Sequence, residues 1–227
     1  IRKNFFMNNK DKSEIIKILK NLVAINSSYP PGNSTQLNKY IFNYLKRAKL
    51  NVSLKGPHKN KLSLIAKNYN GKQKSIVFNS HIDTVQPNKK DWITDPFTLT
   101  KKGNYLHGLG AVNCKGSAAV QMYLASQLKN LFPNLKEKIS FTFVTDEENL
   151  GPDGSFYLRK KKLINPHTLI LGAPTNNNFI VEERGVFWAS VYVKGKTSHA
   201  GEPHKGINAI EKANKIIYNL QTKYRIS

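Results

Sequence analysis

Two groups of histidine and acidic residues each follow a predicted strand of this sequence. The first group is His81 and Asp83, and the second is the acidic run at 146–148. Ligands of open α/β sheets bind at the carboxyl ends of the strands. We therefore expect the two groups to converge on one crevice, although they lie far apart in the chain.

These residue types suit metal-dependent hydrolysis. A carboxylate two residues from a ligand histidine can orient the ring and raise its basicity, as Asp83 would for His81. Of two adjacent glutamates at a strand end, here Glu147 and Glu148, one can bind a metal ion while the other acts as a general base. A lone His-x-Asp pair or a lone acidic run is more often an ordinary solvated surface feature. Only their combination indicates a metal site.

The surrounding pattern predicts an α/β sheet flanked by helices. Apolar residues at helical spacing indicate a first helix with Ser13 as its N-cap, and a second stripe covers 37–48. Short β-type runs at 50–54, 62–67 and 75–79 precede a helix at 116–129. A buried strand at 139–145, a basic helix and a strand at 168–172 follow. Strands that alternate with helices are typical of this fold class.

The pattern changes after residue 178. Residues 180–194 indicate a long β stretch, and a helix follows at about 207–220. We interpret 1–178 as a partial catalytic domain and 179–227 as the start of a smaller, incomplete α+β domain. A hairpin and one helix leave open strand edges, so we expect this second part to be marginally stable alone.

Composition narrows the function classes. The 227 residues are 39% hydrophobic, which suffices for a real core, and 36 basic against 14 acidic residues give a net charge of +22. Such a charge favours polyanions. However, the bases are mostly lysines spread along the chain, which general compositional drift explains, so we expect no nucleic-acid partner.

No 18-residue apolar run predicts a membrane span. The single cysteine, Cys114, fits a cytoplasmic location and should be buried and inert.

Five ordered blocks resemble a known family. They lie at 80–85, 91–97, 108–116, 146–151 and 171–175. They are similar to the signature blocks of the acetylornithine deacetylase, succinyl-diaminopimelate desuccinylase and carboxypeptidase G family of two-zinc amidohydrolases. Residues 183–210 resemble the start of that family's dimerisation (lid) domain. The resemblance runs from about residue 22 to residue 220.

The resemblance implies a zinc-exopeptidase-like sheet, zinc or cobalt as cofactor, and a homodimer formed through the lid. It implies N-acyl amino acids or peptide-like small molecules as substrates, whose amide is hydrolysed. His81 would bind the first metal, oriented by Asp83. Glu147 would be the general base and Glu148 a ligand of the second metal. His199 in the lid would stabilise the developing oxyanion.

Departures from the family pattern bear on activity. The bridging aspartate falls at Asn113, and a carboxylate ligand of the first metal falls at Ala173. The last histidine ligand would lie beyond Ser227, and Leu109 replaces an arginine. By this count each metal keeps one ligand, whereas tight zinc sites need about three or four. We therefore expect the metal centre to fail.

Three hypotheses follow. The first is a degenerate, truncated family member, a pseudoenzyme that is inactive or nearly so alone. The second is one half of a two-chain active hydrolase, although a partner cannot easily restore side chains at Asn113 and Ala173. The third is a non-catalytic binding protein for a small ligand or a polyanion.

Overall fold

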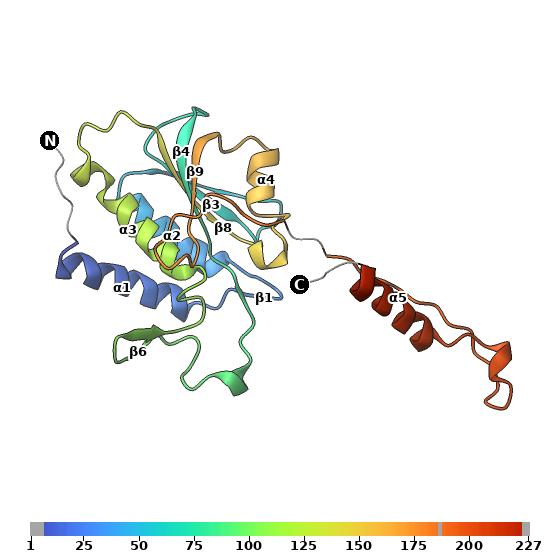
Figure 1. The fold of residues 1–227 in the computed structure, drawn as a ribbon. Coiled ribbons are helices and arrows are strands. Elements are labelled where there is room, and N and C mark those ends of the chain that lie inside the picture. Colours follow the sequence, from blue (N-terminus) through green and yellow to red (C-terminus); the bar gives the residue numbers. More distant parts are fainter. Residues whose placement is uncertain (1–6, 186–187, 224–227) are drawn as a thin grey trace. The chain divides into compact units, whose positions relative to one another are not determined.

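The computed structural model of the chain describes residues 7–185 and 188–223 (Figure 1). Backbone contacts divide the chain into two compact units, Ile1–Phe179 and Ile180–Ser227. None of the described helices is long and apolar enough to cross a membrane.

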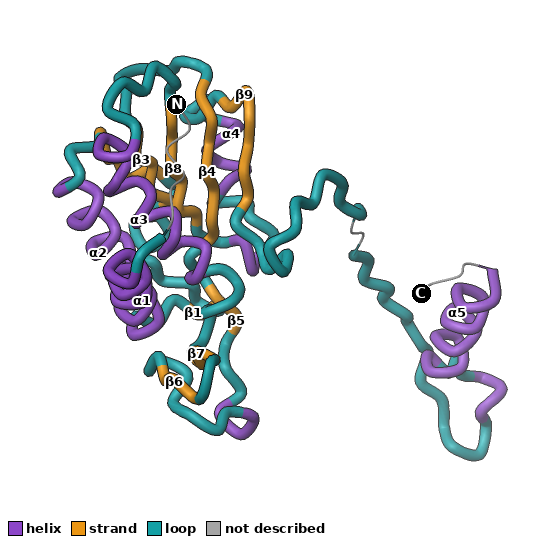
Figure 2. Tube along the Cα trace, turned by 60° about the vertical axis from the view of Figure 1, so that its left-hand side comes forward, coloured by secondary structure: helices purple, strands orange, loops and turns teal. Residues whose placement is uncertain are grey.

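The first unit is built on a five-stranded mixed sheet. In spatial order its strands are β2 (Asn51–Lys55), β3 (Ser63–Lys67), β8 (Ile139–Val144), β4 (Ser75–His81) and β9 (Pro166–Leu171). β8, β4 and β9 run parallel, whereas β3 is antiparallel to both β2 and β8. The carboxyl ends of the three parallel strands, which lie side by side in Figure 2, therefore meet at one edge of the sheet.

Helices cover both faces of this sheet. α1 (Asn9–Ala24), α2 (Thr35–Arg47) and α3 (Lys115–Leu131) lie on one face, and the short α4 (Ser155–Lys160) lies on the other (Figures 1 and 2). The larger core forms between the three helices and the sheet. Its fully buried members include Leu22, Leu37, Ile41, Met122, Phe141 and Phe143. Each such side chain contributes about 1.5–3 kcal/mol through burial.

Smaller elements complete the first unit. β1 (Ser28–Tyr29) pairs in parallel with β5 (Thr84–Val85), and β6 (Thr100–Lys102) pairs with β7 (Tyr105–His107) as a hairpin. Two 3₁₀ turns, η1 (Lys89–Asp91) and η2 (Glu147–Asn149), follow β5 and β8.

The predicted fold class is confirmed, with local corrections at element ends. α1 begins earlier than Ser13 because Asn8 caps it: the Asn8 side-chain oxygen accepts from the main-chain N–H groups of Lys10 and Asp11 at 2.8 and 3.0 Å. In turn, the Asp11 carboxylate accepts a hydrogen bond from the Asn8 main-chain N–H at 2.9 Å, which completes a capping box. β4 continues to His81 rather than ending at Asn79, since its pairing with β8 extends that far.

The second unit contains the predicted helix, α5 (Ala209–Lys223), and a 3₁₀ turn, η3 (Pro203–Lys205). The predicted long strand at 180–194 is wrong for 180–185 and 188–194, which carry no strand, and residues 186–187 lie outside the described chain. A strand requires a hydrogen-bonded neighbour. Among the described residues of this unit, only Lys196 and Ile207 form such a bridge.

Candidate metal centre

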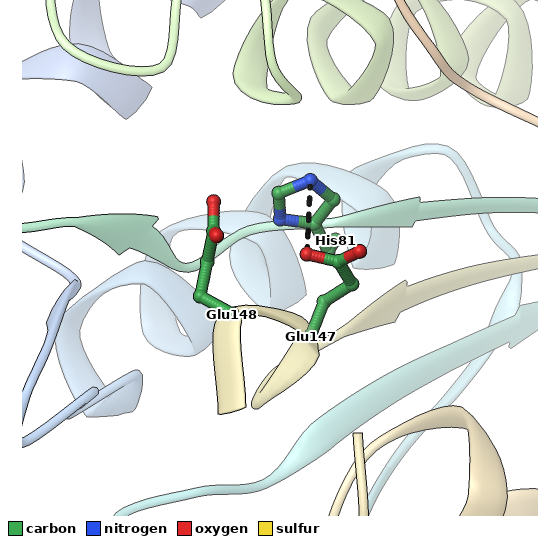
Figure 3. Close-up of side chains that lie close together, drawn as sticks. All are labelled: His81, Glu147 and Glu148. Carbon is green, nitrogen blue, oxygen red and sulfur yellow. Dashed lines mark ion pairs between the residues drawn. The ribbon is translucent and has the colours of Figure 1, made fainter. Parts of the chain in front are cut away.

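The strand pairing of β4 with β8 places His81 beside the acidic run. His81 is the last residue of β4, and its Cα partner is Val144, the last residue of β8. The chain then turns through Asp146, which has a left-handed φ of 67°, into η2. This turn brings Glu147 and Glu148 back toward the imidazole of His81, as Figure 3 shows.

Both ring nitrogens of the buried His81 face oxygen atoms. Nδ1 lies 3.0 Å from the main-chain oxygen of Asp83 and 3.5 Å from its carboxylate. Nε2 lies 3.2 Å from the Asn113 Oδ1 atom and 3.8 Å from the Glu147 carboxylate. Burial by itself lowers the pKa of His81. The hydrogen bond and charge of Asp83, with smaller contributions from Glu147 and Asn113, outweigh burial and raise this pKa to about 9. The metal-free site therefore holds a protonated imidazole at neutral pH.

Asp83 ties the two halves of the site together. Its carboxylate, which is 1% exposed, approaches His81 with one oxygen. The other oxygen accepts a hydrogen bond from the main-chain N–H of Glu148 at 3.0 Å. One buried carboxylate thus fixes the histidine ring and the acidic turn at once. The orienting role expected of Asp83 agrees with this position and stays a prediction.

The three side chains of Figure 3 form a group that can hold a metal ion. One ligand atom each from His81, Glu147 and Glu148 can be chosen so that all three lie within 4.8 Å of one another. The Glu147 side chain is 56% exposed, so it opens to solvent. Glu148 is half-buried; its burial and the negative charge of Glu147 raise the pKa of its carboxyl group, and His81 opposes that shift.

Asp146 does not converge on this group, which corrects the expectation for the whole acidic run. Its fully buried carboxylate forms an ion pair with Lys61 at 2.9 Å and accepts the main-chain N–H of Asp153 at 3.1 Å. A buried carboxylate requires a partner of this kind. Asp146 therefore anchors the turn that carries Glu147 and Glu148. The sequence offers no means to choose Lys61 among so many lysines.

The two degenerate positions, Asn113 and Ala173, lie in a turn before α3 and just past β9. Asn113 precedes α3 and directs its amide oxygen at His81 Nε2, as given above. Ala173 follows β9, is exposed, and offers no side-chain ligand atom. Cys114 is fully buried, as predicted, and its thiol donates to the Gly172 main-chain oxygen at 2.8 Å. Burial raises the pKa of this thiol, so it stays protonated and inert.

A buried lysine beside the site escaped the sequence analysis. The Lys115 side chain is fully buried, and its ammonium donates to the main-chain oxygen of Ile25 at 2.9 Å. Burial lowers the pKa of Lys115 to about 8, against the opposing charge of Asp83. Its position directly after Asn113 and Cys114 is the one feature of the sequence that could have pointed to a place beside the site.

His199 belongs to the second unit. Its exposed ring accepts the Gly201 main-chain N–H at 3.1 Å. Its expected role at a reaction centre stays a prediction.

The donor set of the first unit fits one divalent ion and does not fit two. Two divalent ions about 4 Å apart repel by roughly 17 kcal/mol at an effective dielectric constant near 20. Among the described residues, only Glu147 and Glu148 offer negative charge directly to such ions, because Asn113 and Ala173 are neutral. One ion needs three or four donors at about 2.1 Å, and His81, Glu147 and Glu148 are three candidates for them. The expectation of one ligand per metal stays a prediction, and Glu147 is a further candidate ligand.

The mixed sheet thus gathers a histidine and two glutamates at its strand ends. Residues 77–220 match the model of peptidase family M20/M25/M40, and the chain belongs to that family. The family resemblance stated from the sequence blocks is thereby confirmed.

Individual relatives agree with this assignment. The acetylornithine deacetylase of Buchnera aphidicola subsp. Schizaphis graminum (strain Sg) is 31% identical over 211 residues, covering 90% of this chain and 54% of the relative. The chain thus spans about half the length of this curated relative. A tripeptidase from Staphylococcus aureus shares the fold with a TM-score of 0.66 and 20% identity, covering 94% of this chain and 57% of its own. An M20 metallo-carboxypeptidase from Sulfolobus solfataricus has a TM-score of 0.59 and 17% identity, covering 70% and 37%.

Proposed function

We propose that this chain is an M20 hydrolase domain in which deacylation of N-acyl amino acids or small peptides is strongly impaired. One observation carries the proposal. The side chain at the family's bridging position is the Asn113 amide, whose oxygen lies 3.2 Å from the Nε2 atom of His81. The substrate class comes from the family and from the name of the acetylornithine deacetylase relative.

An amide cannot replace a bridging carboxylate. A carboxylate offers two oxygens and a negative charge, whereas the Asn113 amide offers one neutral oxygen and an N–H₂ group that repels cations. Ala173 removes a second carboxylate from the same edge of the sheet. The two substitutions together remove about two negative charges from the site, which the described acidic residues there do not replace.

The chain's own residues cannot make up this loss. A bound metal ion supplies catalysis by lowering the pKa of its water from 15.7 to about 7. Glu147, which is exposed, is the residue to which the family resemblance gives the role of general base. A site that holds only one ion, however, lacks the second cation that in two-metal sites helps to stabilise the attacking and leaving oxygens. We therefore expect hydrolysis to fall on the order of a thousandfold or more.

The test is hydrolysis of N-acetylornithine by the full chain, with zinc or cobalt added, beside the Buchnera relative. We expect the chain to be on the order of a thousandfold slower or worse, and the double variant Asn113→Asp/Ala173→Glu to be faster than the wild type. Asn178→Asp, which adds a carboxylate at an exposed position past Ala173, serves as the control and should leave the rate unchanged. A wild-type rate equal to that of the relative, lost on chelation, would refute the proposal.

A further inference from the structure

We infer that His81, Glu147, Glu148 and the Asn113 amide oxygen form a site for a single divalent cation of the zinc and cobalt class, in which Glu147 is a ligand instead of a base. The inference rests on the proposed function, because a pair of ions is excluded on the same grounds. Beyond the proposed function, these four residues would still bind one ion.

The distances support one ion. The His81 Nε2 atom lies 3.2 Å from the Asn113 oxygen and 3.8 Å from the Glu147 carboxylate. Two ligands of a tetrahedral ion, each about 2.1 Å from it, lie roughly 3.4 Å apart. The Glu148 carboxylate completes a group whose ligand atoms lie within 4.8 Å of one another. Small side-chain rotations therefore bring the donors to bonding distance.

The charges also select one ion and recruit Glu147. An ion that binds His81 displaces the imidazole proton, and a neutral imidazole, a neutral amide and two carboxylates then carry a charge of −2, which balances one divalent cation. Without Glu147, the ion would have only one negative ligand. The Glu147 side chain is more than half exposed, so it turns toward an ion without disturbing the core. Figure 3 shows both glutamates directed to the same side as the imidazole.

Asp83 prepares the site before an ion arrives. Its buried carboxylate lies against His81 Nδ1, which leaves Nε2 directed at the other donors. The same carboxylate holds the main-chain N–H of Glu148. Two of the ligands are thus tethered to one buried residue, and Asp83 acts as a positioning residue. Partners of this kind commonly change metal affinity by about ten- to a hundredfold.

The donor types indicate the class of cation. One imidazole nitrogen with carboxylate and amide oxygens suits zinc and cobalt. Calcium requires about six to eight oxygen ligands, and magnesium retains most of its water. We therefore expect zinc and cobalt to bind, with calcium and magnesium much weaker.

The experiment is a titration of the full chain, stripped of metal with a chelator, with Co²⁺ followed by its visible absorption and with Zn²⁺ followed by calorimetry. We expect saturation at one ion per chain. Glu147→Gln and Glu148→Gln should each weaken binding about tenfold or more. Glu137→Gln, which alters an exposed glutamate on a loop, is the matched control and should bind like the wild type. Circular dichroism checks that each variant is folded.

Each outcome separates the alternatives. Saturation at two ions, or no binding, overturns the inference. Unchanged affinity in folded Glu147→Gln also overturns it, because a general base would not hold the ion. If one ion binds through Glu147 and the chain still deacylates substrate rapidly, the proposed function fails while the site stands.

Discussion

The protonated state of His81 makes the stability of the metal-free chain depend on pH. The pKa of His81 is about 9 in the folded chain, against an ordinary value of 6.5. The folded chain therefore binds a proton more tightly than the unfolded chain does between these values. The resulting stabilisation is fully present below pH 6.5 and is lost as pH rises through 9.

The size of this effect follows from the two pKa values. At about 1.4 kcal/mol per pKa unit, the full loss is about 3 kcal/mol, and the change from pH 7 to pH 8 is about 1 kcal/mol. Above pH 8, Lys115 acts in the opposite direction. Its pKa is lowered to about 8, so the folded chain releases this proton first and gains stability as pH rises further. Because Lys115 is already half deprotonated at pH 8, His81 dominates the pH dependence in the lower part of this range, from pH 6.5 to about 7.5.

The assay is urea unfolding of the chain in excess chelator, followed by far-ultraviolet circular dichroism at several pH values in this window. The free energy of unfolding should fall by about 1 kcal/mol per pH unit. His81→Asn should abolish this slope, while His167→Asn, an exposed histidine at the start of β9, should retain it. Proton NMR of the imidazoles reads the His81 pKa directly if the variant does not fold. A free energy that stays level or rises from pH 6.5 to about 7.5 would refute the reasoning.

Two further predictions concern the turn that carries the glutamates. Lys61→Met leaves the buried carboxylate of Asp146 without its cation, so the free energy of unfolding should fall by about 3 kcal/mol; a loss below about 0.5 kcal/mol would contradict the assigned anchor. Gly154→Ala places a methyl group against the Thr145 main-chain oxygen, so urea unfolding should show a loss of about 2 kcal/mol or more. Gly185→Ala, whose methyl group meets nothing within 4 Å, should change stability by less than about 0.5 kcal/mol, and equal losses in both variants would count against a local clash.

The central sheet was predictable because its strands are short apolar runs between helices with clear stripes. The approach of His81 to Glu147 and Glu148 was also predictable, because the carboxyl ends of parallel strands lie at the same edge of a sheet even when the strands are far apart in the sequence. The helix start at Asn8 was missed because Ser13 also satisfies the capping preference. Only the reciprocal contact with Asp11 distinguishes the two candidates.

The wrong predictions concern residues whose structure depends on a partner far away in the sequence. Asp146 was grouped with the glutamates because it adjoins them, but its left-handed backbone and its ion pair with Lys61, 85 positions away, direct it elsewhere. The apolar alternation at 180–194 suggested a strand. In the described part of the second unit, that alternation finds no hydrogen-bonding neighbour. The local sequence pattern predicts the propensity of a segment to form a strand. Whether the strand forms depends on a neighbouring segment that can hydrogen-bond to it.

The measurement that tests the account most directly is the number of zinc ions bound to the intact chain, counted by native mass spectrometry after saturation and removal of free metal. The account predicts one ion per chain, since two glutamates, one histidine and one amide balance a single divalent cation. A chain that carries two ions, or none, would contradict it.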